Sequence, residues 1–246
     1  MTKIWRWNEL KGWRARIGIM LPSVNSVLEA EFATLHLKGV TFHYSRMPLS
    51  KGDPLQRLHE MRKSIPSVLS SLETVADVVA FACTSGSFVV GYEQEGAFRI
   101  EMESMLKKTV ITTTQTSMLA LKKLEAKRVA VVTPYTPEIN EKLKEYMEAN
   151  GFKVTLSALD LRGFAGMGSY PEHLLYKAVR SFVVPQNIDA LFIGCTNLAT
   201  WSVLQQIEND IGKPVVTANQ ATLWGVLRES RCEDAIEGLG LLLTQH

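Results

Sequence analysis

The stretch Ile188-Asp189-Ala190-Leu191-Phe192-Ile193-Gly194-Cys195-Thr196-Asn197 decides the fold class. Its apolar residues run without alternation and are followed at once by small and hydroxyl-bearing residues. This pattern is typical of a central parallel strand that ends in a turn. Cys195 then lies at the carboxyl end of the strand. Open α/β sheets bind their ligands at that end, so Cys195 is a candidate functional residue.

The composition is that of a globular protein with one large domain or two small ones. The chain has 246 residues, 21% of them charged, and a formal net charge of +2. Such a small and scattered excess gives no electrostatic reason to expect a nucleic-acid or anionic-membrane partner. No apolar run approaches the roughly 18 residues of a membrane span, and the start of the chain lacks the apolar core of a signal peptide. We therefore expect a cytoplasmic protein, with residues 1–15 as an N-terminal arm.

Three cysteines are too few and too widely spaced for a disulfide framework or a thiolate zinc site. They are Cys83, Cys195 and Cys232. We expect them to be reduced, and any one of them taken alone is first interpreted as a small buried hydrophobic residue. Cys232 keeps that interpretation, because it lies in a charged segment with no strand before it.

Strands and helices are expected to alternate along the first half of the chain. Apolar runs and turn residues predict strands, and helical spacing predicts the segments between them. The expected strands are 16–21, 40–44, 78–82 and 110–113, and the expected helices are 27–37, 54–72 with Pro66 as a candidate kink, 91–106 and 117–124.

The second half of the sequence repeats the first. The matching segments are 16–22 with 128–134, 40–42 with 152–154, and 77–84 with 189–196, all at an offset of 128 minus 16, or 112 residues, and then 110–112 with 215–217 at an offset of 105. Chance agreement of three strands at one offset is improbable. The second cysteine of this repeat is Cys83, since 195 minus 83 is again 112.

The repeat predicts an α/β protein of two lobes, each with a four-stranded parallel sheet flanked by helices. We expect 16–115 and a returning C-terminal helix in 220–246 to form the N-terminal lobe, and 116–219 the C-terminal lobe. A pseudo-twofold axis between them would bring equivalent strand ends face to face. Cys83 and Cys195 should therefore open into one cleft, which favours a paired functional role.

Two facing thiols can do opposite jobs on one flat carbon. A thiolate is a strong nucleophile and, with a pKa of roughly 8.5, also a usable acid or base. Proton removal on one side and addition on the other gives racemisation. Addition of one thiolate to an activated double bond, bond rotation and elimination gives a geometric isomer.

Either reaction builds negative charge that needs hydrogen-bond donors. The hydroxyls of Thr84, Ser85 and Thr196, and the N–H groups that start the following helices, could hold a carboxylate. The same residues are common helix N-caps, so both interpretations stay open. No histidine lies near either thiol in sequence, and there is no nucleotide-binding motif, so we expect neither metal nor cofactor. The glycine-rich segment 163–168 is interpreted as a mobile loop over the cleft.

At these residues the chain resembles the aspartate/glutamate racemase superfamily, in the branch of maleate cis-trans isomerases and arylmalonate decarboxylases. The motifs that carry the resemblance are Pro22-Ser23-Val24-Asn25, Ala82-Cys83-Thr84-Ser85-Gly86, Thr133-Pro134-Tyr135 and Gly194-Cys195-Thr196-Asn197. The resemblance covers nearly everything from Arg16 to Leu243. It implies two Rossmann-like lobes, an active site between them, no cofactor and often a homodimer.

Position by position, the resemblance implies that Cys83 is the nucleophile that adds to the double bond and that Cys195 is the acid or base on the other side. Asn25 and Tyr135 would bind the substrate carboxylates. The turns Thr84-Ser85 and Thr196-Asn197 would help.

Two departures bear on the substrate. The decarboxylases have glycine where this chain has Cys83, which favours an isomerase or racemase here. Maleate isomerases have a second carboxylate-binding asparagine where this chain has Gly163. Arg46 and Arg162 are candidates to supply the missing charge, although Arg162 is better interpreted as a surface residue. Asn219, Gln220 and Trp224 are further candidates to line the pocket, with Trp224 also interpretable as core.

The leading hypothesis is therefore a cofactor-independent isomerase of a small carboxylic acid, with maleate to fumarate as its most specific version. Alternatives are an amino-acid racemase of the aspartate or glutamate type and an arylmalonate decarboxylase that needs only Cys195. From a different class, the lobes could form a carboxylate-binding module without chemistry.

Overall fold

The computed structural model describes residues 11–163, 165–183 and 187–246, and within them the strands form two parallel sheets. The predicted arrangement of two four-stranded parallel sheets is confirmed. The first sheet has the order β2-β1-β3-β4, with β1 (Ala15–Pro22), β2 (Val40–Met47), β3 (Val78–Phe81) and β4 (Val110–Thr112). The second has the order β6-β5-β7-β8, with β5 (Arg128–Thr133), β6 (Lys153–Ala158), β7 (Ala190–Ile193) and β8 (Val215–Thr217).

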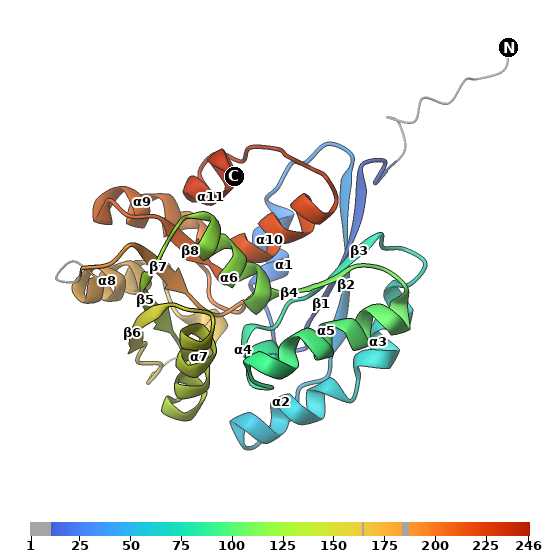
Figure 1. Cartoon of the computed structure of the whole chain (residues 1–246), viewed down its shortest axis with the longest axis horizontal. Coiled ribbons are helices and arrows are strands. Elements are labelled where there is room, and N and C mark those ends of the chain that lie inside the picture. The colour runs from blue at the N-terminus through green and yellow to red at the C-terminus, as the bar shows by residue number, and fades with distance from the viewer. Residues whose placement is uncertain (1–10, 164, 184–186) are drawn as a thin grey trace, which may run out of the picture.

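Helices connect and cover the strands of each sheet (Figure 1). In the first half they are α1 (Leu28–Ala33), α2 (Pro54–Arg62), α3 (Ile65–Leu72), α4 (Thr84–Phe88), α5 (Tyr92–Leu106) and α6 (Thr113–Lys123). In the second half they are α7 (Pro137–Ala149), α8 (Glu172–Val183), α9 (Trp201–Ile211), α10 (Ala218–Glu229) and α11 (Gly240–Gln245), with a short 3₁₀ helix at Met167–Ser169.

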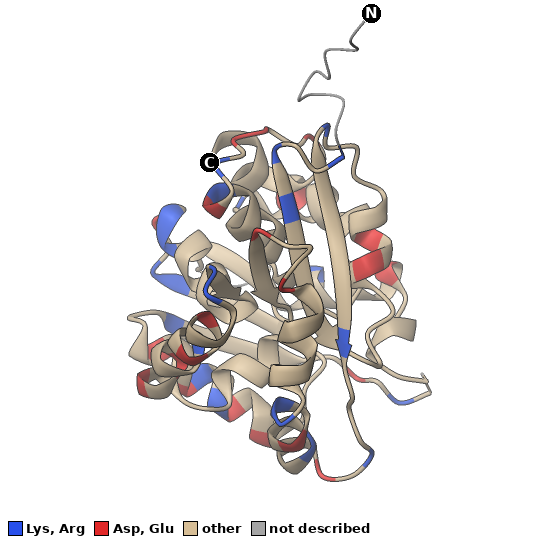
Figure 2. Ribbon diagram, turned by 90° about the vertical axis from the view of Figure 1, so that its right-hand side faces the viewer, with Lys and Arg blue, Asp and Glu red and all other residues tan. Residues whose placement is uncertain are grey.

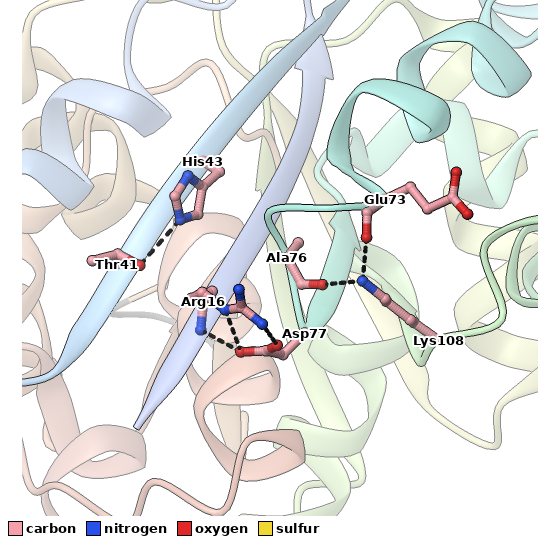
Figure 3. A network of polar contacts seen from close by, with 7 residues as sticks. All are labelled: Arg16, Thr41, His43, Glu73, Ala76, Asp77 and Lys108. Carbon is pink, nitrogen blue, oxygen red and sulfur yellow. Dashed lines mark hydrogen bonds and ion pairs between the residues drawn. The ribbon is translucent and has the colours of Figure 1, made fainter. Parts of the chain in front are cut away.

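The internal repeat is present in the structure. β3 and β7 begin 190 minus 78, or 112, residues apart, and β4 and β8 begin 215 minus 110, or 105, residues apart. Equivalent ion pairs also join the two central strands of each sheet at their amino ends. In the first sheet Arg16 of β1 pairs with Asp77, just before β3, at 2.6 Å (Figure 3), and in the second sheet Arg128 of β5 pairs with Asp189, just before β7, at 2.6 Å. The two sheets are therefore built alike from their amino ends.

Local chemistry moves some element boundaries from their predicted positions. The helix predicted over 54–72 is two helices, and Pro66 lies in the first turn of α3, where a missing N–H costs no helical hydrogen bond. Helix α6 begins at Thr113, earlier than predicted, because the Thr112 hydroxyl caps it by accepting from the Gln115 N–H at 3.1 Å. Strand β2 continues to Met47, beyond the predicted end at residue 44.

Two helices join the lobes. α6 and α10 pack side by side at the centre of the molecule (Figure 1), and α10 also contacts β3 and β4 of the first sheet. A Cβ added at Gly225 of α10 would lie 2.3 Å from Cγ2 of Thr116, so glycine is needed for this close approach. Helix α10 thus shares a core with the first sheet, whereas α11 packs against β8 and α9.

Charge is interspersed rather than concentrated. In the view of Figure 2, Lys and Arg alternate with Asp and Glu along the helices of the described chain. Among the described residues, no helix is both long and apolar enough to cross a membrane.

Candidate active site

A cavity of about 320 Å³ lies where the central strands of both sheets end. In each sheet the chain leaves the first central strand to one side and the second to the other, and such switch points are where α/β sheets bind ligands. All eight site residues predicted from the sequence line it: Asn25, Cys83, Thr84, Ser85, Tyr135, Cys195, Thr196 and Asn197. Their roles in catalysis and binding stay predictions.

Cys83 lies between the end of β3 and the first turn of α4. Its extended backbone turns directly into the helix, and its thiol is only 5% exposed. A Cβ added at Gly86 would lie 3.0 Å from the Cys83 Sγ, so glycine keeps the space beside the sulfur open. Burial raises the pKa of the Cys83 thiol to about 11. The Gly86 N–H, the Ser85 hydroxyl and the charge of Arg57 oppose that rise.

Cys195 has a different setting. A turn follows it, and α9 begins only at Trp201, so the predicted donors from a helix start are wrong for this thiol. Instead the Asn197 N–H donates to the Cys195 Sγ at 3.3 Å, and the Met167 sulfur lies 3.6 Å away. Burial raises the pKa of Cys195 to about 12, against the Asn197 N–H and the Tyr135 hydroxyl, while the neighbouring Cys83 adds to the rise.

Tyr135 supplies a buried hydroxyl between the two thiols. Burial, and after it the charges that Cys195 and Cys83 can carry, raise the pKa of Tyr135 well above its ordinary value. The hydroxyl therefore stays protonated and can donate a hydrogen bond to developing negative charge. The Thr84 hydroxyl oxygen is also buried, and its interaction with the Tyr135 hydroxyl opposes the rise in the pKa of Tyr135.

Asn25 and Thr196 bridge the lobes. Asn25 Oδ1 accepts from the N–H groups of Val27 and Leu28, both at 3.0 Å, and Asn25 Nδ2 donates to Thr196 Oγ1 at 3.2 Å. The Thr196 hydroxyl donates in turn to the Ala82 carbonyl at 3.1 Å. A substrate carboxylate would have to compete with these bonds or accept from the outer side of the Asn25 amide.

Asn197 makes a second bridge. Its Oδ1 accepts from the Ser26 N–H at 2.9 Å, and its Nδ2 donates to the Val24 carbonyl at 3.3 Å. A Cβ added at Gly168 would lie 2.9 Å from this Oδ1, so the loop after residue 165 packs directly on the bridge. Residue 164 of the predicted mobile loop lies outside the described residues.

Several further candidates do not line the cavity. Arg46 donates to the Asn25 carbonyl at 2.7 Å and pairs with Glu29, so it supports Asn25 from behind. Arg162 pairs with Asp160 at 2.6 Å, and its side chain is 91% exposed.

The residues after β8 serve the fold. Asn219 Nδ2 donates to Glu31 at 2.6 Å, the Gln220 side chain donates to the Leu239 carbonyl, and Trp224 packs against the core.

Among the described residues no group of three or more His, Cys, Asp or Glu side chains is arranged to hold a metal ion.

Sequence reasoning missed the wall of the cavity. Arg57 is the one charged residue among the described residues that line it, and the apolar part of the wall consists of Pro22, Val24, Leu49, Pro54, Leu58, Pro134, Ile139, Leu161 and Met167. The helical spacing over 54–72 gave no signal for Arg57. Only the packing of α2 against α4, a contact distant in sequence, places it there.

Comparison with known proteins agrees with this architecture. A sequence model described as arylmalonate decarboxylase matches residues 17–243. The maleate isomerase of Nocardia farcinica is 28% identical over 94% of this chain and 96% of its own length, and the arylmalonate decarboxylase of Bordetella bronchiseptica is 24% identical over 86% and 89%.

Among solved structures, a cysteine-to-serine mutant of Nocardia farcinica maleate cis-trans isomerase with a covalently bound succinylcysteine intermediate aligns with a TM-score of 0.86. That alignment has 26% identity and covers 94% of this chain and 99% of the other. With a family match over most of its length, the chain belongs to the arylmalonate decarboxylase family.

Proposed function

We propose that this protein is a cofactor-independent cis-trans isomerase of a small unsaturated dicarboxylic acid, with conversion of maleate to fumarate as its reaction. The observation that carries the proposal is the pair of buried thiols, Cys83 and Cys195, from equivalent strand ends and lining one cavity. A relative with this fold, named maleate isomerase, has been trapped as a succinylcysteine intermediate.

The first half of the reaction is addition. The Cys83 thiolate attacks one alkene carbon and forms a C–S bond, and the electron pair of the double bond takes a proton from the Cys195 thiol at the other carbon. Negative charge that develops on the neighbouring carboxylate is stabilised by the Tyr135 hydroxyl and by the donors around Thr84. The product is a succinyl group on Cys83 with a single bond between its central carbons.

The second half is rotation and elimination. The central bond turns, the Cys195 thiolate removes the proton from its carbon, and the C–S bond breaks as the double bond re-forms in the trans geometry. Cys83 leaves as a thiolate and Cys195 is again a thiol, so both groups return to their starting states. Only groups of this chain are used, and no oxidant or cofactor is required.

The two thiols suit these unequal roles. The Ser85 hydroxyl and the Arg57 charge favour the thiolate of Cys83, whereas the groups that favour the thiolate of Cys195, the Asn197 N–H and the Tyr135 hydroxyl, carry no charge. Cys83 therefore ionises first and acts as the nucleophile, and Cys195 keeps its proton and acts as the acid. Burial holds both pKa values above neutrality, so the thiolate form of Cys83 is a small fraction at pH 7.

One observation favours a second candidate. Much of the cavity wall is apolar, which suits the substituent of a disubstituted malonate, and the matching family model is described as arylmalonate decarboxylase. Decarboxylation would need Cys195 only, to protonate the carbanion that remains after carbon dioxide leaves.

Single substitutions test the proposal. Cys83→Ser and Cys195→Ser should each lower the rate of maleate conversion by about 10³-fold or more with the circular dichroism spectrum unchanged. Cys232→Ala is the matched control, because Cys232 is buried in the core away from the cavity and should leave the rate unchanged. Full activity in either serine variant would overturn the isomerase proposal, and loss of carbon dioxide from an arylmalonate by Cys83→Gly would favour the decarboxylase.

The proposal includes a small carboxylic-acid substrate, a cytoplasmic location and a homo-oligomeric state. All three cysteines are free thiols, which supports a reducing compartment. Gel filtration with light scattering tests the oligomeric state, and a monomer would contradict it.

A further inference from the structure

Arg57 has a charged side chain without a partner inside the described part of the chain. It projects from α2 into the cavity, and its Nε is buried yet makes no hydrogen bond there. Asp53, one turn earlier, caps the helix by accepting from the Gln56 N–H at 2.9 Å instead of pairing with Arg57. A buried guanidinium nitrogen without an acceptor is costly, so Arg57 would stabilise an anion bound in this cavity.

The position of Arg57 relative to the thiols is set by packing. Helix α2 contacts α4, which follows Cys83 directly, and the charge of Arg57 is near enough to lower the pKa of that thiol against the effect of burial. Arg57 also lines the hollow beside residues 165–169. Its charge therefore acts on the Cys83 thiol, and its side chain lies beside the loop that borders the cavity.

Other cations near the cavity are already paired. Arg46 is held by Glu29 and the Asn25 carbonyl, and Arg162 by Asp160. The polar residues around the thiols are hydroxyls and amides without formal charge. A dicarboxylate brings two negative charges, so neutral donors serve one carboxylate while the other needs the guanidinium.

We propose that Arg57 binds the second carboxylate of the substrate and sets the specificity of this enzyme for dicarboxylic acids over monocarboxylic acids. The inference rests on the proposed function for the identity of the substrate, but it concerns binding and can be measured without turnover. Arg57 is then a specificity-determining residue, and the group reacting at Cys83 is held from its far end.

Succinate and butyrate are suitable probes, because both lack the double bond and cannot add a thiol. Their dissociation constants are to be measured by calorimetry for the wild type, Arg57→Gln, Arg57→Lys and the control Arg162→Gln. Arg57→Gln should raise the succinate dissociation constant about 10-fold to 100-fold and change that of butyrate less than about threefold. Arg57→Lys should fall between, since lysine keeps the charge but loses the planar fork. The control should match the wild type.

Three results would overturn the proposal: unchanged succinate affinity in Arg57→Gln, equal weakening of both ligands, or no succinate binding by the wild type. The alkylation rate of Cys83 distinguishes a direct role of Arg57 from an indirect one. If Arg57 acted only by lowering the pKa of Cys83, Arg57→Gln would slow alkylation of Cys83 and leave the preference for succinate over butyrate unchanged. If the wild type binds succinate through Arg57 but does not convert maleate, the proposed function fails and this inference stands. If Arg57→Gln converts maleate with an unchanged KM, the proposed function stands and this inference fails.

Discussion

The two lobes are alike at the amino ends of their strands and different at the carboxyl ends. At the amino ends the pairs Arg16–Asp77 and Arg128–Asp189 have the same partners and the same length of 2.6 Å. At the carboxyl ends the same thiol occurs twice, but a helix follows Cys83 at once and a turn follows Cys195.

This difference makes two equivalent cysteines chemically unequal. Ser85, Gly86 and the charge of Arg57 favour the thiolate of Cys83, whereas Cys195 has the uncharged donors Asn197 and Tyr135. A duplicated fold thus preserves the contacts that hold each sheet and lets the two halves of its site take different roles. Addition followed by elimination needs that inequality, because one sulfur must attack while the other gives a proton.

Among the substitutions that test this difference between the lobes, loss of the Tyr135 hydroxyl should have the largest effect, a decrease in kcat. The residue equivalent to Tyr135 in the first lobe is Ser23, since 135 minus 112 is 23. We expect Tyr135→Phe to lower kcat for maleate about 10²-fold, because one donor to developing charge is lost. Steady-state kinetics followed by NMR measure it. Tyr146→Phe, in the same lobe but away from the cavity, is the control, and an equal loss there would remove the special role of Tyr135.

Glu31 is a contact between the lobes that the repeat does not duplicate. Its equivalent is Leu143, since 31 plus 112 is 143. Glu31 accepts from the N–H groups of Thr200 and Trp201 at 2.7 and 2.9 Å. Glu31→Ala should lower the free energy of unfolding by about 3 kcal/mol, because buried donors lose their acceptor. Urea denaturation tests this, and a change within error would show that the lobes hold together without it.

The same residue gives a pH dependence. Burial raises the pKa of Glu31, so the folded state disfavours its ionised form. Stability should therefore decrease as pH rises from the ordinary glutamate pKa through the raised one. Glu31→Gln should flatten this slope above the ordinary glutamate pKa.

Alkylation compares the thiols directly. Because the Ser85 hydroxyl and the Arg57 charge favour its ionised form, Cys83 should have the larger thiolate fraction at neutral pH. Iodoacetamide should therefore modify Cys83 first, and both rates should rise with pH up to about 11. Peptide mass spectrometry resolves the sites. Faster labelling of Cys195 would reverse the assigned roles.

The ion pairs at the amino ends should have the smallest effect. Although burial opposes it, hydrogen bonds from Arg16 lower the pKa of Asp77, and Arg128 lowers that of Asp189. Each pair stabilises the fold above the ordinary aspartate pKa and loses that contribution as pH falls. Asp77→Asn and Asp189→Asn should shift Tm by similar amounts of no more than a few degrees, because the pairs are solvent-exposed. Unequal Tm shifts would contradict the claim that the amino ends of the two sheets are alike.

Much of this fold could be predicted because strand patterns and an internal repeat can be recognised in the sequence without knowledge of the packing. Apolar runs at 78–81 and 190–193 and a shared offset sufficed to predict two sheets and two facing thiols. That the turn after Cys195 continues until α9 begins at Trp201 could not be predicted, because hydroxyl and amide residues suit a helix start and a turn equally. Nor could Arg57 be predicted, since its place depends on the packing of α2 against α4.

The most direct test of unequal thiols is to trap the intermediate. Cys195→Ser incubated with maleate and quenched with acid should show, by peptide mass spectrometry, a mass increase equal to one maleic acid on the peptide with Cys83. Cys83→Ser treated in the same way should show no adduct on Cys195. An adduct on Cys195, or equal adducts in both variants, would contradict the assignment of Cys83 as nucleophile and Cys195 as proton donor.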